Sequence, residues 1–110
     1  MILYRRYFFQ SVHSLKSHGE TLHGHGYKLE IGFLPDLTWR QADECVRDNI
    51  LKVLHGHEIQ CINPATGENI VNWIHAELLK TKMGESLISV ALQETAKNRF
   101  ISQQTKAQYV

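Results

Sequence analysis

Three histidines in the first quarter of the chain have the spacing of a metal site. His23 and His25 flank a single glycine, and His13 lies ten residues before His23. Side chains alternate between the faces of an extended strand, so positions i and i+2 point the same way. A third imidazole from a neighbouring strand would complete a set of three nitrogen ligands. Three protein ligands and one open position are typical of catalytic zinc, although imidazole also binds iron, nickel and copper.

A second His-Gly-His triplet occupies residues 55–57, in different surroundings. Apolar residues at helical spacing precede it, and Gly56 stands where a helix often ends. We therefore expect His55 and His57 at a helix end or in a loop, where the helix dipole alone favours histidine.

The bulk properties of the chain exclude several classes of protein. It has 110 residues and a formal net charge of +1, with acidic and basic residues interleaved. The length predicts one domain over residues 1–110, and the charge pattern does not favour nucleic-acid binding. No apolar run is long enough to cross a membrane. Two cysteines make no disulfide framework, and the N-terminus is apolar and then charged, the reverse of a secretory signal, so we expect a cytoplasmic protein.

The elements that would position the histidines follow a simple order. Residues 2–12 and 23–33 read as two strands, the second with alternating apolar side chains. Thr38 begins a capping-box pattern for a helix to about Leu54, and Thr66 is a plausible cap for a second helix that Gly84 would close.

Two more strands follow the second helix. Residues 88–92 alternate, with Glu94 in register with their apolar face, and the last strand is expected near residues 99–104. The order β-β-α-α-β-β predicts an α+β fold with two helices on one face of a four-stranded antiparallel sheet. Its open edges would need a partner, so we expect a homo-oligomer.

Four motifs in this order resemble the 6-pyruvoyl-tetrahydropterin and 6-carboxy-tetrahydropterin synthase family. They are residues 9–15, a first strand that ends near His13; residues 23–27, His-Gly-His and an aromatic; Asn63-Pro64 before a helix with Trp73-Ile74; and Gln93-Glu94-Thr95. A lone His-x-His motif is weak evidence for a family, but four motifs in the right order over nearly the whole chain are specific evidence.

The resemblance implies a tunnelling fold (T-fold). Subunits of this kind form trimers whose sheets make a barrel, and two trimers commonly stack into a hexamer. The implied active sites lie between subunits and act on the pterin 7,8-dihydroneopterin triphosphate. By resemblance, His13, His23 and His25 would hold Zn²⁺, and Glu94, with Thr95 beside it, would bind the pterin through paired N–H groups.

The chain departs from the family pattern at its proton-transfer residues. Gly19 stands where the family's catalytic cysteine is expected, four residues before His23, and Glu20 follows it. This resembles a branch with glutamate three residues before His-Gly-His, which cleaves the substrate side chain to give 6-hydroxymethyl-7,8-dihydropterin for folate synthesis. The family's Asp-His pair aligns with His55 and Gly56, so His57 could serve as acid or base instead.

The sequence therefore predicts a zinc-dependent lyase of the tetrahydropterin synthase type, with Glu20, His55 and His57 as catalytic candidates. A non-catalytic pterin- or metal-binding paralogue is the alternative, and a zinc hydrolase on the same scaffold is a third possibility. Folate, biopterin and queuosine pathways all stay open. Cys61 could replace the missing thiol, while His18 and His75 read as surface residues. Lys16, Lys97 and Arg99 could meet a triphosphate or be ordinary solvated charges.

Overall fold

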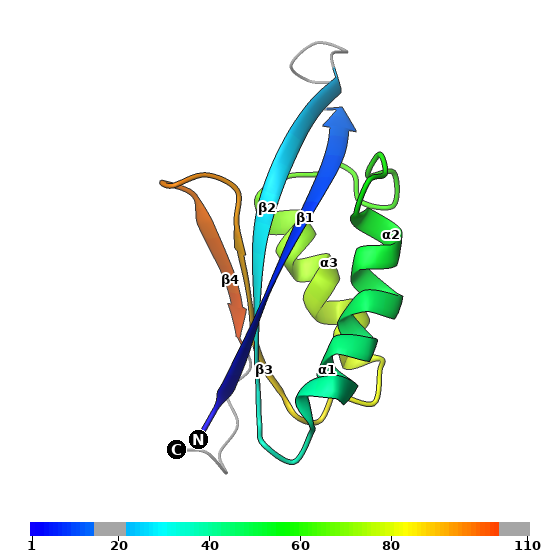
Figure 1. The fold of residues 1–110 in the computed structure, drawn as a ribbon. Coiled ribbons are helices and arrows are strands. Elements are labelled where there is room, and N and C mark those ends of the chain that lie inside the picture. Colours follow the sequence, from blue (N-terminus) through cyan, green and yellow to red (C-terminus); the bar gives the residue numbers. More distant parts are fainter. Residues whose placement is uncertain (15–21, 104–110) are drawn as a thin grey trace.

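The computed structural model describes residues 1–14 and 22–103, which form a sheet and a layer of helices (Figure 1). The elements in chain order are β1 (Leu3–Ser14), β2 (Leu22–Phe33), α1 (Trp39–Val46), the π-helical η1 (Arg47–Leu51), α2 (Lys52–Leu54), α3 (Gly67–Leu79), β3 (Leu87–Gln93) and β4 (Arg99–Gln103). Because α1, η1 and α2 form one continuous helical run, the predicted β-β-α-α-β-β order is confirmed. Within the described ranges, no helix has the length and apolar character needed to span a membrane.

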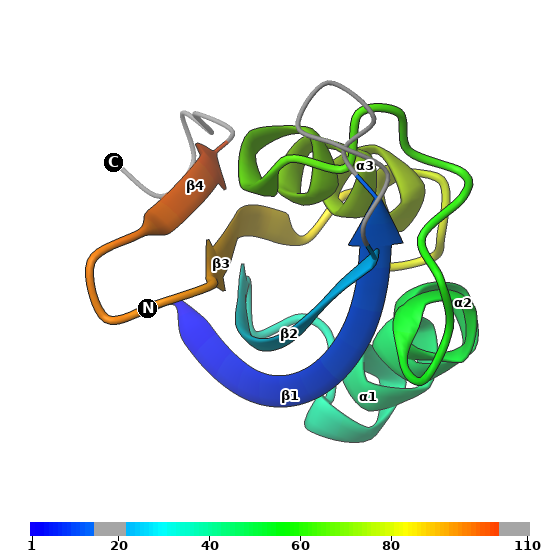
Figure 2. The ribbon, with the colours of Figure 1, turned by 90° about the horizontal axis from the view of Figure 1, so that it is seen from above.

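The strands form one antiparallel sheet in the order β1-β2-β3-β4. The helices all lie on one side of it, as Figure 2 shows in the view from above. Strand alternation sends one set of side chains towards the helices, and this helix-covered face is apolar. Its buried residues include Phe9, Tyr27, Leu29, Ile31 and Phe33. The opposite, helix-free face carries Tyr4, Arg6, Phe8, Lys28 and Glu30.

The β1–β2 hairpin is the longest pairing in the molecule. Its register runs without a break from Leu3 opposite Phe33 to Ser14 opposite Leu22. His13 is thereby paired with His23. β3 then pairs with β2 only over the half of β2 that is remote from these histidines, from Lys28 to Phe33.

Caps define where the helices begin, as the sequence predicts. Thr38 and Gln41 form a complete capping box, and the Thr66 hydroxyl accepts the N–H of Asn69. The first helical run ends at Leu54, and Gly56 adopts a φ of +74°, which glycine accommodates without strain. The second helix ends at Leu79, several residues before the expected stop at Gly84.

His75 is the clearest correction to the sequence prediction. We expected it at the surface, but it is buried, with only 5% of its area exposed. It follows Val71 by one helical turn and so shares the inner stripe of α3, which packs against the sheet. Burial lowers the pKa of His75, and a hydrogen bond to the backbone of Ser102 acts in the opposite direction.

A partly buried polar cluster connects α1 to β1. The Tyr7 hydroxyl and the Arg5 guanidinium both donate to the carboxylate of Asp43, with the Arg5 Nη2 to Oδ2 distance at 3.1 Å. Desolvation alone would raise the pKa of Asp43, but the hydrogen bonds from Tyr7 and Arg5 outweigh it and lower the pKa. The guanidinium also lies over the Trp39 ring, 5.1 Å from its centroid.

Replacing Asp43 by Asn is expected to lower the free energy of unfolding by about 1 to 2 kcal/mol, because two donors lose a charged acceptor. Urea unfolding at fixed protein concentration measures the change. Asp48→Asn is the matched control, since Asp48 is exposed on the same helical run; it should change stability by less than about 0.5 kcal/mol. Equal effects of the two substitutions would contradict a special role of Asp43.

The Asp43 contribution should also depend on pH in one direction. Its folded-state pKa is lowered, so the stabilisation is present above the unfolded-state pKa and is lost as the pH falls through the folded-state value. The stability difference between the native chain and Asp43→Asn should therefore shrink in strong acid. A difference that stays constant from neutral to acidic pH would argue against a lowered pKa.

Candidate metal and pterin site

The three predicted metal ligands occupy neighbouring positions at one end of the β1–β2 hairpin. His13 and His23 are cross-strand partners, and His25 lies two residues further along β2, opposite Ser11. By strand alternation these backbone positions share the helix-covered face of the ladder. The side chains of His13 and His23, and the whole of Glu20 and His18, lie outside what the structure describes, so the ligand set and the role of Glu20 stay predictions.

The described part of this site centres on His25 and Glu94. The Nδ1 atom of His25 lies 3.4 Å from the Oε1 atom of Glu94. Their side chains are 31% and 18% exposed, so both are accessible and neither is fully solvated. Glu94 comes directly after β3, whose last residue, Gln93, pairs with Lys28 of β2. The end of β3 thus carries this carboxylate to the histidine end of the hairpin.

An aromatic pair makes a rigid base under these groups. The rings of Tyr27 and Phe9 stack with centroids 4.9 Å apart, and both residues are fully buried. The Tyr27 ring centroid also lies 6.0 Å from that of His25. Burial, together with the negative charge of Glu94, raises the pKa of Tyr27, so its phenol stays protonated at neutral pH.

The second His-Gly-His triplet lies along the outer edge of β1. The Gln10 N–H donates to Nδ1 of His55 at 3.1 Å, and the Gly56 N–H donates to the Gln10 carbonyl at 2.7 Å. The Val12 N–H donates to the His57 carbonyl, and Val12 and Glu58 form a parallel bridge. His55 thus uses its imidazole to satisfy a strand-edge N–H, which requires an unprotonated Nδ1. The imidazole of His57 makes no such contact within the described residues.

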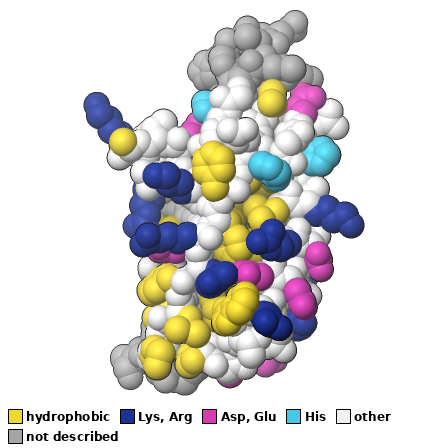
Figure 3. All heavy atoms as spheres, viewed as in Figure 1, with side chains coloured by type: hydrophobic (Ala, Val, Ile, Leu, Met, Phe, Trp, Pro, Cys, Tyr) yellow, Lys and Arg dark blue, Asp and Glu magenta, His cyan; other side chains and the backbone are white. Residues whose placement is uncertain are grey.

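A hollow of about 390 Å³ is lined by part of the first triplet and by the glycine of the second. Residues 10–12 of β1, residues 24–26 of β2 and Gly56 line it. Figure 3 shows histidine side chains gathered towards this end of the molecule. The hollow would give a small ligand access to the exposed part of His25.

Other predicted site residues have identifiable surroundings. The Thr95 hydroxyl accepts the N–H groups of Lys97 and Asn98 and so caps the β3–β4 turn. Cys61 is exposed in the loop before α3, whereas Cys45 is buried, as expected of a helix core residue. The side chains that the structure describes contain no group of three metal-binding residues. The side chains of His13 and His23 are not among those described, so this statement does not include them.

The sequence interpretation missed a charged cluster on the helix-free face. Arg6, Lys28, Glu30 and Arg99 meet there around a second hollow. The charges at positions 28 and 30, two residues apart on one face of a strand, could have indicated a charged patch. The addition of Arg6 from β1 and Arg99 from β4 depends on the sheet register, which the sequence does not show.

Comparisons with known proteins place the fold. No family model and no curated protein sequence matches the chain. Among solved structures, a Caenorhabditis elegans 6-pyruvoyl tetrahydropterin synthase superposes with a TM-score of 0.75 at 16% identity, covering 96% of each chain. The Plasmodium falciparum enzyme gives a TM-score of 0.70 at 15% identity, over 96% of this chain and 98% of the other.

A variant of the Plasmodium vivax enzyme is also similar. It carries alanine in place of a glutamate described as a catalytic residue, and it superposes with a TM-score of 0.67 at 17% identity, over 96% of this chain and 99% of the other. Since these likenesses cover almost the full length of both partners, this chain has the fold of the 6-pyruvoyl tetrahydropterin synthases.

Proposed function

We propose that this protein is a zinc-dependent pterin synthase, a lyase that acts on 7,8-dihydroneopterin triphosphate or a closely related pterin. The observation that carries the proposal is the convergence of His25 and Glu94, 3.4 Å apart, at the hairpin end where His13 and His23 pair. The fold likeness to 6-pyruvoyl tetrahydropterin synthases supports the same class of substrate.

The donor set suits zinc. His13, His23 and His25 would supply three imidazole nitrogens from adjacent backbone positions, and the hollow beside His25 would admit a fourth ligand. Glu94 near Nδ1 of His25 favours the tautomer that presents Nε2 to a metal. When bound, Zn²⁺ would lower the pKa of a substrate hydroxyl and stabilise developing negative charge.

Glu94 has the capacity to bind the pterin at the same time. A carboxylate offers about four lone-pair positions, and the contact with His25 involves Oε1. The remaining positions can accept the parallel N–H groups of a pterin ring. The Thr95 hydroxyl already accepts a hydrogen bond in the β3–β4 turn, so the role of Thr95 would be to hold the backbone next to Glu94 in place.

Proton transfer is assigned to Glu20, with His57 as its partner. The Plasmodium vivax structure supports a glutamate in this role, because its replaced glutamate is described as catalytic. A carboxylate that removes a side-chain hydroxyl proton would favour carbon–carbon cleavage to 6-hydroxymethyl-7,8-dihydropterin. Between the second-triplet histidines, His57 is the better acid or base, because Nδ1 of His55 is occupied by the Gln10 N–H.

Oligomerisation through the sheet edges completes the proposal. The outward backbone groups of Gln10 and Val12 are covered by residues 55–59. Alternation places the backbone groups of Tyr4, Arg6 and Phe8 on the same edge, and nothing in the described chain covers them. Pairing of this edge with β4 of a second copy would build the trimeric barrel, and stacking of two trimers a hexamer.

A second candidate function is binding without turnover. Two observations favour it: Gly19 replaces the family's catalytic cysteine, and the His55 imidazole is engaged at the edge of β1. Such a protein would bind zinc and a pterin but release no product.

The direct test incubates the zinc-loaded protein with 7,8-dihydroneopterin triphosphate and identifies products by mass spectrometry. We expect 6-hydroxymethyl-7,8-dihydropterin, and Glu20→Ala should reduce the rate by roughly 10²- to 10⁴-fold. Glu68→Ala, an exposed glutamate on α3, is the control and should retain the rate. Tight binding of zinc and pterin with no product would favour the second candidate, and an unchanged rate in Glu20→Ala would remove Glu20 from the mechanism.

Removing the carboxylate of Glu94 should weaken pterin binding more than zinc binding. Glu94→Gln is expected to lower affinity for a pterin product roughly 10- to 100-fold, the value of hydrogen bonds to a charged acceptor. Zinc affinity, measured by chelator competition, should fall by less than the pterin affinity, because the three imidazole ligands stay in place and Glu94 would act on the metal only through His25. Glu68→Gln should change neither. Unaltered pterin affinity in Glu94→Gln would overturn the anchoring role.

A further inference from the structure

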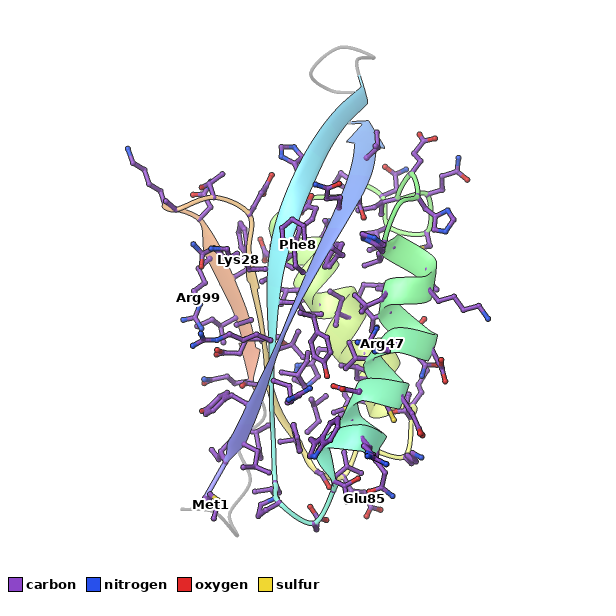
Figure 4. The ribbon with its side chains drawn as sticks, viewed as in Figure 1. Met1, Phe8, Lys28, Arg47, Glu85 and Arg99 are labelled. Carbon is purple, nitrogen blue, oxygen red and sulfur yellow. The ribbon has the colours of Figure 1, made fainter. Side chains whose placement is uncertain are left out.

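We infer that the hollow on the helix-free face is a binding site for a multivalent anion of the phosphate class. The hollow has a volume of about 620 Å³ and crosses all four strands. Its charged side chains are Arg6, Lys28, Glu30 and Arg99. Figure 4 shows Lys28 and Arg99 on the side of the sheet away from the helices.

The sheet register creates the hollow. Ala91 of β3 lies opposite Glu30 of β2, and its methyl group leaves space between the longer side chains on either side. Arg99 of β4 reaches over β3 to the Glu30 carboxylate, and Arg6 of β1, the cross-strand partner of Glu30, contacts the same carboxylate from the other side. The Arg6 Nε atom lies 2.9 Å from Oε2 of Glu30, and the Arg99 Nη2 atom lies 3.5 Å from Oε1. Each carboxylate oxygen therefore holds one guanidinium at the rim.

The cluster carries more positive charge than Glu30 can balance. Arg6, Lys28 and Arg99 against one carboxylate leave an excess of two positive charges, whereas the whole chain carries a formal charge of +1. Lys28 is exposed and has no ion-pair or hydrogen-bond partner within the described residues. Like charges gathered in one concavity repel one another and focus a positive potential into it. A bound multivalent anion would relieve that repulsion.

The chemistry of the donors favours phosphate groups. Guanidinium groups present forked N–H donors that match phosphate oxygens, and the Lys28 ammonium adds a mobile point charge. The volume lies within the range of small-molecule sites. Phe8 lines the same hollow with 56% of its area exposed, so a ring attached to the phosphates would find an aromatic surface.

This site does not depend on the proposed function. Glu94 and His25 do not line the larger hollow. A polyphosphate can also bind a metal directly, so the test uses protein stripped of metal by a chelator. Binding then reports on the cationic cluster and not on the histidine site.

The experiment measures tripolyphosphate binding to the metal-free protein by isothermal titration calorimetry. Lys28→Gln should weaken binding about fivefold or more, and added salt should weaken it further through screening. Lys52→Gln is the matched control, because Lys52 is exposed on α2, on the helix-covered side of the sheet. It should leave the affinity for tripolyphosphate unchanged. Absence of binding to the native chain, or equal losses in Lys28→Gln and Lys52→Gln, would overturn the inference.

A second arm separates inorganic polyphosphate from a phosphorylated ring compound, with GTP as the ring-bearing probe. If Phe8→Ala weakens GTP binding and leaves tripolyphosphate binding intact, the site takes a ring-bearing phosphate. If Phe8→Ala changes neither affinity, the site recognises the phosphates alone. Both results support the anion site provided that Lys28→Gln weakens both ligands, and GTP binding that is insensitive to Lys28→Gln would contradict it.

Discussion

The register between β1 and β2 is the constraint on which the rest of this structure depends. It pairs every residue from Leu3 to Ser14 with one from Phe33 back to Leu22. A slip of one residue would move each side chain of the slipped strand to the other face. Phe9 and Tyr27 would no longer stack in the core, and positions 13 and 23 would lose their pairing. The fully buried aromatic pair therefore fixes the geometry of the proposed metal site as well as the core.

The same register divides two kinds of chemistry between the faces of the sheet. The helix-covered face carries the apolar core and, beyond the end of β3, His25 and Glu94. The helix-free face carries the cationic hollow around Glu30. Residues 55–59 add a third element by covering the β1 edge at Gln10 and Val12, next to the first triplet. Among the described residues, nothing covers the rest of that edge, where Tyr4, Arg6 and Phe8 lie.

Local signals in the sequence were sufficient to predict most of the fold. Alternation in residues 27–33, the capping box at Thr38 and the cap at Thr66 each depend on nearby residues, and each prediction is confirmed. His75 was wrongly placed at the surface because its burial depends on packing between α3 and the sheet. The π-helical turn in the first helical run had no signal in the apolar spacing, which is compatible with either geometry.

The site was less predictable because its parts meet only through tertiary pairing. The approach of Glu94 to His25 follows from the alternation of residues 88–92 once β3 is paired with β2. The use of the His55 imidazole as an acceptor for a strand N–H could not be foreseen, because it requires the loop at 55–59 to lie against β1. The Arg6–Glu30–Arg99 arrangement likewise brings β4 to side chains of the β1–β2 hairpin, from which it is distant in the sequence.

X-ray absorption spectroscopy of the zinc-loaded protein tests the central claim most directly, because it reports the atoms that surround the metal. The register predicts three imidazole nitrogens at about 2.0 to 2.1 Å and one further oxygen or nitrogen ligand, with no sulfur. Loss of one imidazole from the spectrum of His25→Ala would assign that residue. A sulfur ligand at about 2.3 Å, or a spectrum unchanged in His25→Ala, would contradict a metal site built on the paired ends of β1 and β2.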